Sequence, residues 1–341
     1  MLKLFKPFIS QDARDNVQRV LNSDEITQGK EVELFEKELE EKLGKKCLTV
    51  NSGTSALALA YELADIQEGD EVITPILTCT ATNLPLLHRK AKVVFADIDY
   101  DLNINIEDVE KKITKKTKAI VFVHFGGNSR GLSDLVAICR RRNIALIEDA
   151  AQAIASDYWG QADFTAVSLQ AIKTITSGDG GLLICKRDED YEKAKRLRWF
   201  GIDRDDRSRD ITEAGHKYHM NNISAAIGRG NLQYLNALKK HQIVLKEIYE
   251  SYGLTAHTWL AGGLSFKFSE LKKELNDSGY ECDQHHYRND KYAVFGGRVT
   301  DCPNMDELED KYFFVPFHYD VSEEDAHKIG KIWYNYTNKS S

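Results

Sequence analysis

One lysine stands out because of the residues that surround it. Lys173 lies in the segment AVSLQAIKTITSGDGG (residues 166–181), among apolar and small residues and shortly before a glycine-rich turn. A lysine that is removed from water has a lowered pKa, and its neutral amine is a nucleophile towards aldehydes. Most lysines are simply solvated, so this segment alone leaves both interpretations open.

A carboxylate follows a second apolar run. Residues 145–152 read ALIEDAAQ, which predicts a strand that delivers Asp149 at its carboxyl end, where open α/β sheets place their ligands. A buried aspartate needs a partner because an unpaired charge there is costly. A protonated pyridine nitrogen would be such a partner, and the pair would preserve the ring as an electron sink. A cap on the next turn explains Asp149 equally well.

A third segment is suited to phosphate. Residues 50–57 read VNSGTSAL, directly after a predicted strand and at the start of a predicted helix. The free backbone N–H groups and the dipole of a helix N-terminus favour an anion there. An ordinary N-cap with a tight turn is the alternative. Neither a Walker loop nor Gly-x-Gly-x-x-Gly occurs, which disfavours nucleotide hydrolases and nicotinamide dehydrogenases.

These segments fall in a stretch that alternates short apolar runs with helical patterns, from about residue 47 to residue 186. The alternation is typical of β-α-β units and predicts an α/β fold with a mostly parallel seven-stranded sheet and helices on both faces. The expected strands are Cys47–Val50, Glu71–Pro75, Lys92–Ile98, Ala119–Phe125, Ala145–Glu148, Phe164–Leu169 and Gly181–Lys186. The expected helices include Ser55–Ala64, Ile106–Ile113 and Leu132–Arg142.

The C-terminal part predicts a smaller α+β domain. A long helical pattern runs from Ile223 to about Tyr252 and leads into it. The apolar stripe of this pattern consists of Leu232, Leu235, Leu238, Ile243, Leu245 and Ile248. Further elements are a strand at Tyr312–Phe317 and helices at Ser269–Ser278 and Ser322–Tyr334. We therefore expect a large domain over residues 1–240 and a small domain over 241–341, with the charge run Asp203–Asp210 as a solvated loop.

Composition limits the class of protein. A chain of 341 residues with a net charge of −7 gives no electrostatic reason to expect nucleic-acid or membrane binding. The first residues lack the apolar core of a signal peptide, and no later run is long enough to cross a bilayer, so we expect a cytoplasmic protein. The six cysteines form no Cys-x-x-Cys pair, so we expect reduced thiols and no bound metal.

In their order along the chain, the phosphate segment, Asp149-x-x-Gln152 and Ser168-x-x-x-x-Lys173 resemble the aspartate aminotransferase superfamily. They are most similar to its sugar aminotransferase branch, the DegT/StrS family. The resemblance covers nearly the whole chain. It includes Phe5-Lys6-Pro7, Thr27-Gln28-Gly29, Pro75–Asn83, Val123-His124-Phe125-Gly126, Tyr218-His219-Met220 and Val315-Pro316-Phe317-His318.

The resemblance implies pyridoxal 5′-phosphate (PLP) as the cofactor and PLP fold type I as the fold. Lys173 would bind the cofactor covalently and later move a proton between carbon positions. Asp149 would pair with the pyridine nitrogen, and Gln152 would donate a hydrogen bond to the phenolic oxygen. The phosphate would be held by Gly53, Thr54 and Ser168. Members of the family are usually homodimers with active sites completed by the partner subunit, and we expect the same arrangement.

Two expected cofactor residues depart from the family pattern. Cys79 stands where the family usually has an aromatic residue that stacks on the cofactor ring. Lys217 precedes Tyr218-His219-Met220, where the family commonly has an asparagine that reaches the partner subunit's phosphate. A lysine could contact that phosphate as a point charge.

A polar cluster in the C-terminal part consists of His285, His286, Tyr287 and Arg288. Of these, His286, Tyr287 and Arg288 are the expected substrate contacts. The resemblance puts a His-Tyr pair near the sugar nucleotide, and the planar guanidinium of Arg288 suits a pyrophosphate. A surface loop is the alternative explanation of the cluster. By resemblance His124 and His318 also contact substrate, although a satisfied core histidine is the ordinary alternative for each.

These features predict an aminotransferase that moves an amino group from an amino acid, expected to be glutamate, to a nucleotide-linked keto-deoxysugar. Such reactions make deoxyaminosugars for lipopolysaccharide and other glycans. The alternatives are a PLP-dependent sugar dehydratase and a catalytically silent relative that acts as a scaffold or regulator. In this family the dehydratase is associated with a histidine in place of the lysine, so Lys173 argues against it. The departures at Cys79 and Lys217 are consistent with a silent relative.

Overall fold

The computed structural model describes residues 1–203 and 210–338. Most of the charge run Asp203–Asp210, predicted to be a surface loop, lies outside the described residues. Within the two described ranges, no helix is long and apolar enough to span a membrane.

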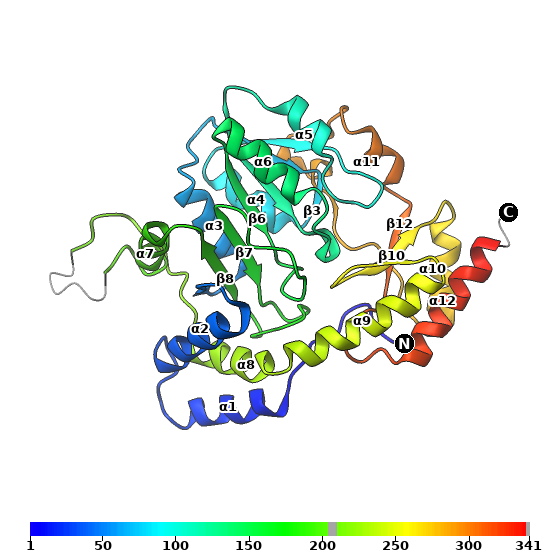
Figure 1. Cartoon of the computed structure of the whole chain (residues 1–341), viewed down its shortest axis with the longest axis horizontal. Coiled ribbons are helices and arrows are strands. Elements are labelled where there is room, and N and C mark those ends of the chain that lie inside the picture. Colours follow the sequence, from blue (N-terminus) through cyan, green and yellow to red (C-terminus); the bar gives the residue numbers. More distant parts are fainter. Residues whose placement is uncertain (204–209, 339–341) are drawn as a thin grey trace.

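A seven-stranded, mostly parallel sheet forms the centre of the large domain, as the sequence predicted (Figure 1). The strand order is β1-β8-β7-β6-β5-β2-β4, and β8 alone runs antiparallel to its neighbours on both sides. The strands are β1 (Leu48–Val50), β2 (Glu71–Pro75), β4 (Lys92–Ala96), β5 (Thr117–Val123), β6 (Ala145–Asp149), β7 (Phe164–Ser168) and β8 (Gly181–Cys185). Because β6 and β7 are parallel neighbours, their carboxyl ends meet at one edge of the sheet.

The sheet is buried on both faces because its side chains alternate between two apolar layers. In β5, Val121 and Val123 point into the layer that contains α3 and α7, whereas Ile120 and Phe122 point into the layer that contains α5 and α6. Helices α2 and α8 extend the second layer beneath β7 and β8. These helices are α2 (Lys30–Leu43), α3 (Gly53–Leu63), α4 (Thr80–His88), α5 (Ile106–Lys112), α6 (Leu132–Arg142), α7 (Asp188–Leu197) and α8 (Asn222–Leu232).

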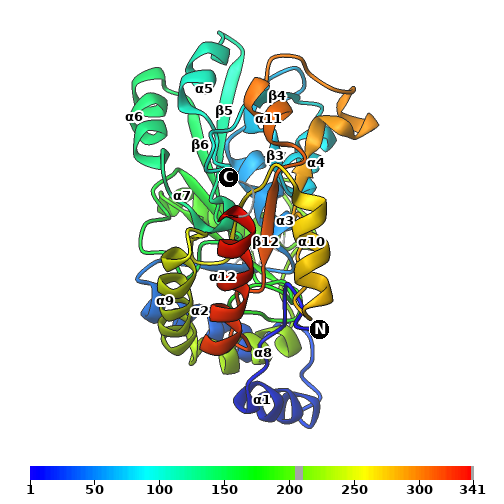
Figure 2. The ribbon, with the colours of Figure 1, turned by 90° about the vertical axis from the view of Figure 1, so that its right-hand side faces the viewer.

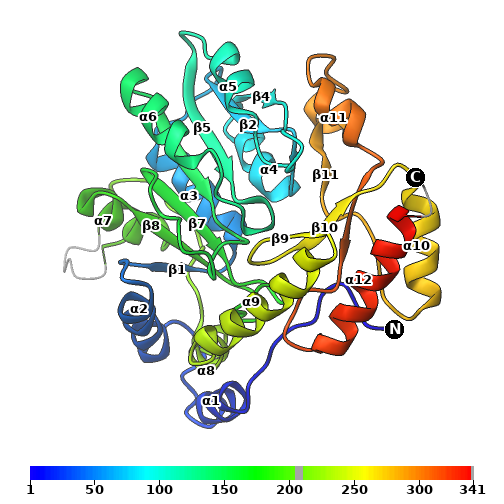
Figure 3. The ribbon, with the colours of Figure 1, turned by 45° about the vertical axis from the view of Figure 1, so that its right-hand side comes forward.

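A smaller antiparallel sheet, of order β12-β10-β9, packs with three helices to form the small domain (Figures 2 and 3). Its elements are β9 (Thr255–Ala256), β10 (Ala261–Leu264), β12 (Tyr312–Val315), α9 (Leu235–Ser251), α10 (Phe268–Asp277) and α12 (Glu323–Asn338). Gly262 permits the close pairing of β10 with β12, because a Cβ at this position would lie 1.9 Å from the carbonyl oxygen of Phe313.

The helical pattern predicted from Ile223 to Tyr252 is wrong as a single element. The chain turns after α8, where the Tyr234 N–H donates to the Asn231 carbonyl at 3.0 Å, and α9 begins at Leu235. Ile243, predicted in the buried stripe, is 47% exposed because it lies on the side of α9 opposite the buried Leu245. The predicted boundary between residues 240 and 241 falls inside α9, and the division into 1–240 and 241–341 stays a proposal.

The first residues of the chain run between the small domain and the large domain. Leu2 pairs with Tyr280 in a parallel bridge, and the Leu4 N–H donates to the Glu281 carboxylate at 2.8 Å. Residues 2–8, which we call the N-terminal strap, run from the small domain towards the large one (Figure 3). They lead into α1 (Gln11–Leu21), which packs against α8.

A short ribbon fixes residues near the C-terminus beside the large domain. Strand β3 (Leu77–Thr78) pairs with β11 (Tyr287–Arg288), and the Asn289 carboxamide donates to the Thr78 carbonyl at 2.7 Å. The ribbon therefore holds residues 285–288 next to residues 77–79. The other described elements are α11 (Pro303–Leu308) and the 3₁₀-helices η1 (Phe125–Gly127), η2 (Asn289–Lys291) and η3 (Ala293–Phe295).

Candidate active site

A cavity of about 260 Å³ lies at the carboxyl ends of β6 and β7. The start of α3, the turn between β3 and α4, the loop after β7 and the residues before β11 complete its walls. The predicted site residues that line it are Gly53, Cys79, Asp149, Gln152, Ser168, Lys173 and His286. The three segments that the sequence singled out thus meet in one place, because parallel strands deliver their carboxyl ends to the same edge.

Lys173 lies in the loop that follows β7. Its Nζ atom is 3.8 Å from the centroid of the Trp259 ring. Burial lowers the pKa of Lys173 to about 8, although the nearby Cys79 and Asp149 act in the opposite direction. The amine therefore reaches its neutral, nucleophilic form at a lower pH than an ordinary lysine does.

Asp149 ends β6 and is 4% exposed. One carboxylate oxygen accepts a hydrogen bond from Thr82 Oγ1 at 2.7 Å, and the other accepts from the Ala151 N–H at 3.1 Å. Burial raises the pKa of Asp149 even though both hydrogen bonds oppose the shift. A positively charged nitrogen in the cavity would give this carboxylate the partner that burial demands.

The N-terminus of α3 forms another wall of the cavity. Ser52 caps the helix, and its Oγ accepts a hydrogen bond from the Ser55 N–H at 3.0 Å. The N–H groups of Gly53 and Thr54 come at the positive end of the helix dipole, where a helix offers them no carbonyl partner of its own. A Cβ on Gly53 would lie 2.9 Å from the Cβ of Ser168, so glycine is needed for this close approach. An anion can come close to the backbone here.

Gln152 and His286 are hydrogen-bonded to each other. The Gly126 N–H donates to Gln152 Oε1 at 2.6 Å, and Gln152 Nε2 lies 3.0 Å from His286 Nε2. Because an amide nitrogen only donates, His286 accepts through Nε2 and carries its proton on Nδ1. Burial lowers the pKa of His286 well below 6.5, so its ring is neutral.

Cys79 lies at the N-cap of α4 and lines the cavity. Burial raises the pKa of its thiol, so the side chain is a small neutral group. All six cysteines are free thiols. Over residues 1–203 and 210–338, no group of three or more His, Cys, Asp or Glu side chains is arranged to hold a metal ion.

The structure does not bring His124, an expected substrate contact, to the cavity. His124 is fully buried and its Nε2 lies 3.0 Å from Glu148 Oε2. Burial by itself would raise the pKa of Glu148, but hydrogen bonds from His124 and from the backbone of Gly160 and Gln161 lower it overall. We therefore correct the expectation for His124, which is the core histidine of a satisfied buried pair.

The expectation that Arg288 binds the substrate is corrected as well. Its side chain is fully buried, with two parallel hydrogen bonds of 2.7 Å to the Asp290 carboxylate. Its Nη1 donates to Asp306 at 2.5 Å and to Glu309 at 3.3 Å. The hydrogen bonds to Asp290 hold the pKa of Arg288 above its ordinary value. Each guanidinium nitrogen already binds a carboxylate, so Arg288 is no longer proposed for a pyrophosphate.

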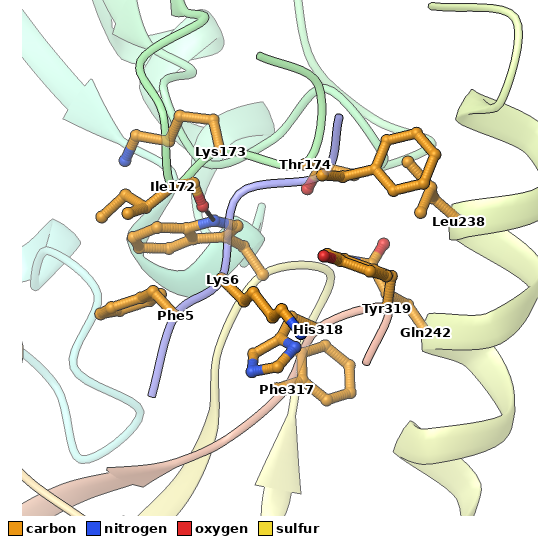
Figure 4. A pocket seen from close by; sticks show the side chains of 12 residues that line it. Phe5, Lys6, Ile172, Lys173, Thr174, Leu238, Gln242, Phe317, His318 and Tyr319 are labelled. Carbon is orange, nitrogen blue, oxygen red and sulfur yellow. Dashed lines mark hydrogen bonds between the residues drawn. The ribbon is translucent and has the colours of Figure 1, made fainter. Parts of the chain in front are cut away.

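His318 lies on a neighbouring cavity of about 30 Å³, which Lys173 also lines (Figure 4). Its Nε2 donates to the Lys3 carbonyl at 2.9 Å, and its Nδ1 accepts from the Asp320 N–H at 3.3 Å. Both ring nitrogens therefore have backbone partners, and burial lowers the pKa of the ring. These contacts tie the N-terminal strap to the small domain, and the expected substrate contact of His318 stays a prediction.

Three further expected residues, besides His124, Arg288 and His318, lie outside the walls of the main cavity. Thr54 is exposed on the first turn of α3. Tyr287 is 40% exposed on β11, with Lys291 Nζ 3.8 Å from its ring centroid. Lys217 is exposed, and its carbonyl accepts a hydrogen bond from the Asn51 carboxamide at 3.2 Å.

Sequence reasoning missed Thr82 and Trp259. Thr82 binds Asp149 although 67 residues separate them. Trp259 comes from the loop between β9 and β10, and no spacing in the sequence connects it with Lys173. A Thr four residues after Thr78 and a lone Trp carry no signal by themselves.

Comparisons with known proteins agree with this geometry. The chain is 31% identical to GDP-perosamine synthase of Vibrio cholerae, over 93% of this chain and 86% of that protein. It is 31% identical to an uncharacterized protein of Methanocaldococcus jannaschii, over 94% of each. The crystal structure of the sugar aminotransferase CalS13 from Micromonospora echinospora superposes with a TM-score of 0.91 at 27% identity, and covers 98% of this chain and 100% of that one.

The fold is that of the sugar aminotransferases, PLP fold type I. The model of the DegT/DnrJ/EryC1/StrS aminotransferase family matches residues 7–332, and the chain belongs to this family.

The family is PLP-dependent, and the residues present fit that cofactor. The cavity combines an enclosed amine, a buried carboxylate whose pKa burial has raised, and a helix N-terminus with a glycine held against Ser168. These are the groups that can bind an aldehyde, a protonated ring nitrogen and a phosphate.

Proposed function

We propose that this chain is a PLP-dependent aminotransferase that transfers the amino group of glutamate to a nucleotide-linked keto-deoxysugar. The observation that carries the proposal is the enclosed amine of Lys173, which shares one cavity with the Asp149 carboxylate and the N-terminus of α3. The name of the Vibrio cholerae relative, GDP-perosamine synthase, supports a nucleotide-linked sugar as the acceptor.

The cofactor-binding residues have distinct proposed roles. Lys173 holds the cofactor and, when it is free, carries a proton between substrate carbons. Asp149 binds the ring nitrogen in its charged form, and Gln152 donates to the phenolic oxygen from an amide that Gly126 fixes. The phosphate contacts are proposed for Gly53, Thr54 and Ser168. When bound, PLP supplies an electron-withdrawing ring that stabilises negative charge on the reacting carbon.

Substrate contacts are proposed for His286 and Tyr287. His286 lines the cavity, and Tyr287 follows it on β11, paired with Thr78 of the cavity wall. The Lys291 ammonium lies over the Tyr287 ring and offers a positive charge in place of the buried Arg288. This pair is suited to the polar part of a sugar nucleotide.

We also propose a homodimer with shared active sites. Lys217 is exposed and joined through its carbonyl to Asn51, beside the proposed phosphate site of α3. A lysine at such a surface could reach the phosphate of a second subunit. Mixing inactive Lys173→Ala with an impaired Lys217→Ala variant should restore partial activity, because each mixed dimer regains one complete site. A monomer by light scattering, or no recovery after verified subunit exchange, would contradict this.

The function is tested with purified protein and PLP. The complex should be yellow, and borohydride should leave the cofactor attached to the peptide that contains Lys173. In separate samples that are not treated with borohydride, glutamate should convert the cofactor to its amine form with release of 2-oxoglutarate, and a panel of keto-sugar nucleotides should reverse the change. Ping-pong kinetics should follow.

A catalytically silent relative and a sugar dehydratase would each give a different result in that experiment. A silent relative would stay colourless with PLP. A dehydratase would release water from the sugar without consuming glutamate. Failure of every keto-sugar, with an intact glutamate half-reaction, would keep the aminotransferase and remove the sugar acceptor.

A further inference from the structure

The amine of Lys173 is part of a column of three side chains from three distant segments. Its Nζ lies 3.8 Å from the Trp259 ring centroid, and the Phe5 ring stacks on the same indole at 5.0 Å and 18°. The column therefore joins the loop after β7, the small domain and the N-terminal strap.

The indole at the centre of the column is held firmly. Trp259 is 3% exposed, and its Nε1–H donates to the Ile172 carbonyl at 3.2 Å. Its backbone N–H donates to the Gly126 carbonyl at 2.9 Å. The His285 ring meets the indole edge-on at 5.3 Å. Because these contacts fix the Trp259 indole, the ring face that Lys173 contacts has a defined position.

The amine has few other partners. Across residues 1–203 and 210–338, no acceptor forms a hydrogen bond or an ion pair with Lys173 Nζ. The titratable groups that influence it are Cys79 and Asp149, which favour its charged form, and the rings of His285 and His286. Burial lowers the pKa of both rings, that of His285 to about 3, so both are neutral. The indole face is thus in direct contact with the ammonium, at 3.8 Å from its centroid.

We propose that Trp259 is a positioning residue for Lys173, whose indole face holds the protonated amine beside the cavity whenever that amine is not covalently engaged. The proposal rests on the proposed function of Lys173. The attraction requires a cation, because the ring quadrupole acts on the ammonium charge and not on a neutral amine. Loss of the proton therefore releases the side chain from the indole, and the neutral amine is the form that turns into the cavity.

The proposal predicts a change in the pKa of Lys173 itself. The full-length protein, freed of cofactor by dialysis against hydroxylamine, is labelled with a trace of acetic anhydride at a series of pH values. Mass spectrometry then quantifies acetylation of Lys173. In Trp259→Leu, which keeps an apolar neighbour but removes the π face, the pKa should fall about one unit below its value in the unchanged protein.

Two further variants make the result specific. Trp259→Phe retains an aromatic face and should recover at least about half of the shift. Trp333→Leu removes another largely buried tryptophan, which packs on Phe313 in the small domain, and should leave the Lys173 pKa unchanged. An unchanged or raised pKa in Trp259→Leu would overturn the proposal, as would an equal shift in Trp333→Leu.

A second measurement leaves Trp259 in place and so does not depend on whether its variants fold. Tryptophan emission of the cofactor-free protein should change through the pH range near 8 in which Lys173 loses its proton. The same change should be absent in Lys173→Met. Identical emission profiles of the two proteins would refute the contact. Neither experiment involves turnover, so their failure is distinguishable from failure of the aminotransferase proposal.

Discussion

Arg288 is a fully buried basic side chain and Lys173 a partly buried one, yet their surroundings are opposite. The Arg288 guanidinium is matched by carboxylates from three residues, and its pKa is raised. The Lys173 amine lies over an aromatic ring, and burial brings its pKa down to about 8. A buried charge with satisfied hydrogen bonds is fixed in one state, whereas one without them can change its protonation and react.

The contrast between Lys173 and Arg288 predicts its largest effect for Lys173→Ala. Turnover should fall by at least about a thousandfold, because the side chain is both the proposed attachment point and the proposed proton carrier. The fold should persist, since the change removes a desolvated charge and, among the residues that the structure describes, breaks no hydrogen bond of the side chain. Coupled assay of 2-oxoglutarate and thermal unfolding would measure the two effects. Full transamination by this variant would remove Lys173 from its central role.

Arg288→Met should instead lower the free energy of unfolding. Removal of one partner from a buried ionic network leaves uncompensated carboxylates and costs about 3–5 kcal/mol of the free energy of unfolding. Arg298 is the matched control, because it pairs with the same Glu309 but is 56% exposed. Arg298→Met should have a much smaller effect, because water screens an exposed ion pair. Urea denaturation of both would decide, and equal effects would contradict the contrast.

The pH dependence of stability sharpens the comparison further. The pKa of Lys173 is about 8 in the folded protein and 10.5 ordinarily, so between these values the unfolded chain binds a proton that the folded chain does not. Stability of the cofactor-free protein should therefore rise with pH through this window. Relative to Lys173→Met, the gain should approach about 3 kcal/mol, which urea denaturation at pH 7 and pH 10.5 would detect. Equal pH profiles for the two proteins would mean that the amine is not desolvated.

A smaller effect is expected at the hydroxyl that holds Asp149. Thr82→Val removes the 2.7 Å hydrogen bond while keeping the shape of the side chain, so the pKa of Asp149 should rise further. We expect kcat of the glutamate half-reaction to fall about tenfold. A tenfold change corresponds to about 1.4 kcal/mol, which is close to the lowest free energy usual for a hydrogen bond to a charged group. Thr78→Val is the control, since Thr78 contacts Thr82 at 2.9 Å but not Asp149, and its effect should be smaller. Stopped-flow absorbance would separate them.

The sequence predicted much of the large domain and of the cavity for one physical reason. Strands β6 and β7 are apolar runs of clear length, and parallel pairing carries the residues at their ends to one edge. Lys173, Asp149 and Gly53 therefore meet as their order along the chain predicts. The turn between α8 and α9 was missed because one apolar stripe continues across Gln233 and Tyr234.

The errors at Arg288 and His124 have a different origin. A side chain with hydrogen-bonding capacity can bind a ligand or a carboxylate of its own protein, and its sequence neighbours do not decide between these. Arg288 finds Asp306 and Glu309 through the placement of α11, and His124 finds Glu148 on the adjacent strand β6. Both pairings depend on tertiary packing, which cannot be read from the spacing of residues along the chain.

The N-terminal strap also has a consequence for the order in which the protein is completed. The hydrogen bonds from Leu4 to Glu281 and from His318 to Lys3 close loops of 277 and 315 residues. During synthesis these early residues emerge long before the segments that receive them, so their docking must follow that of the small domain. The stacking of Phe5 on Trp259 can therefore form only after the small domain has folded. The lysine side of the cavity is thereby completed by residues that are synthesised before the segments on which they dock, and that take their places only after those segments have folded.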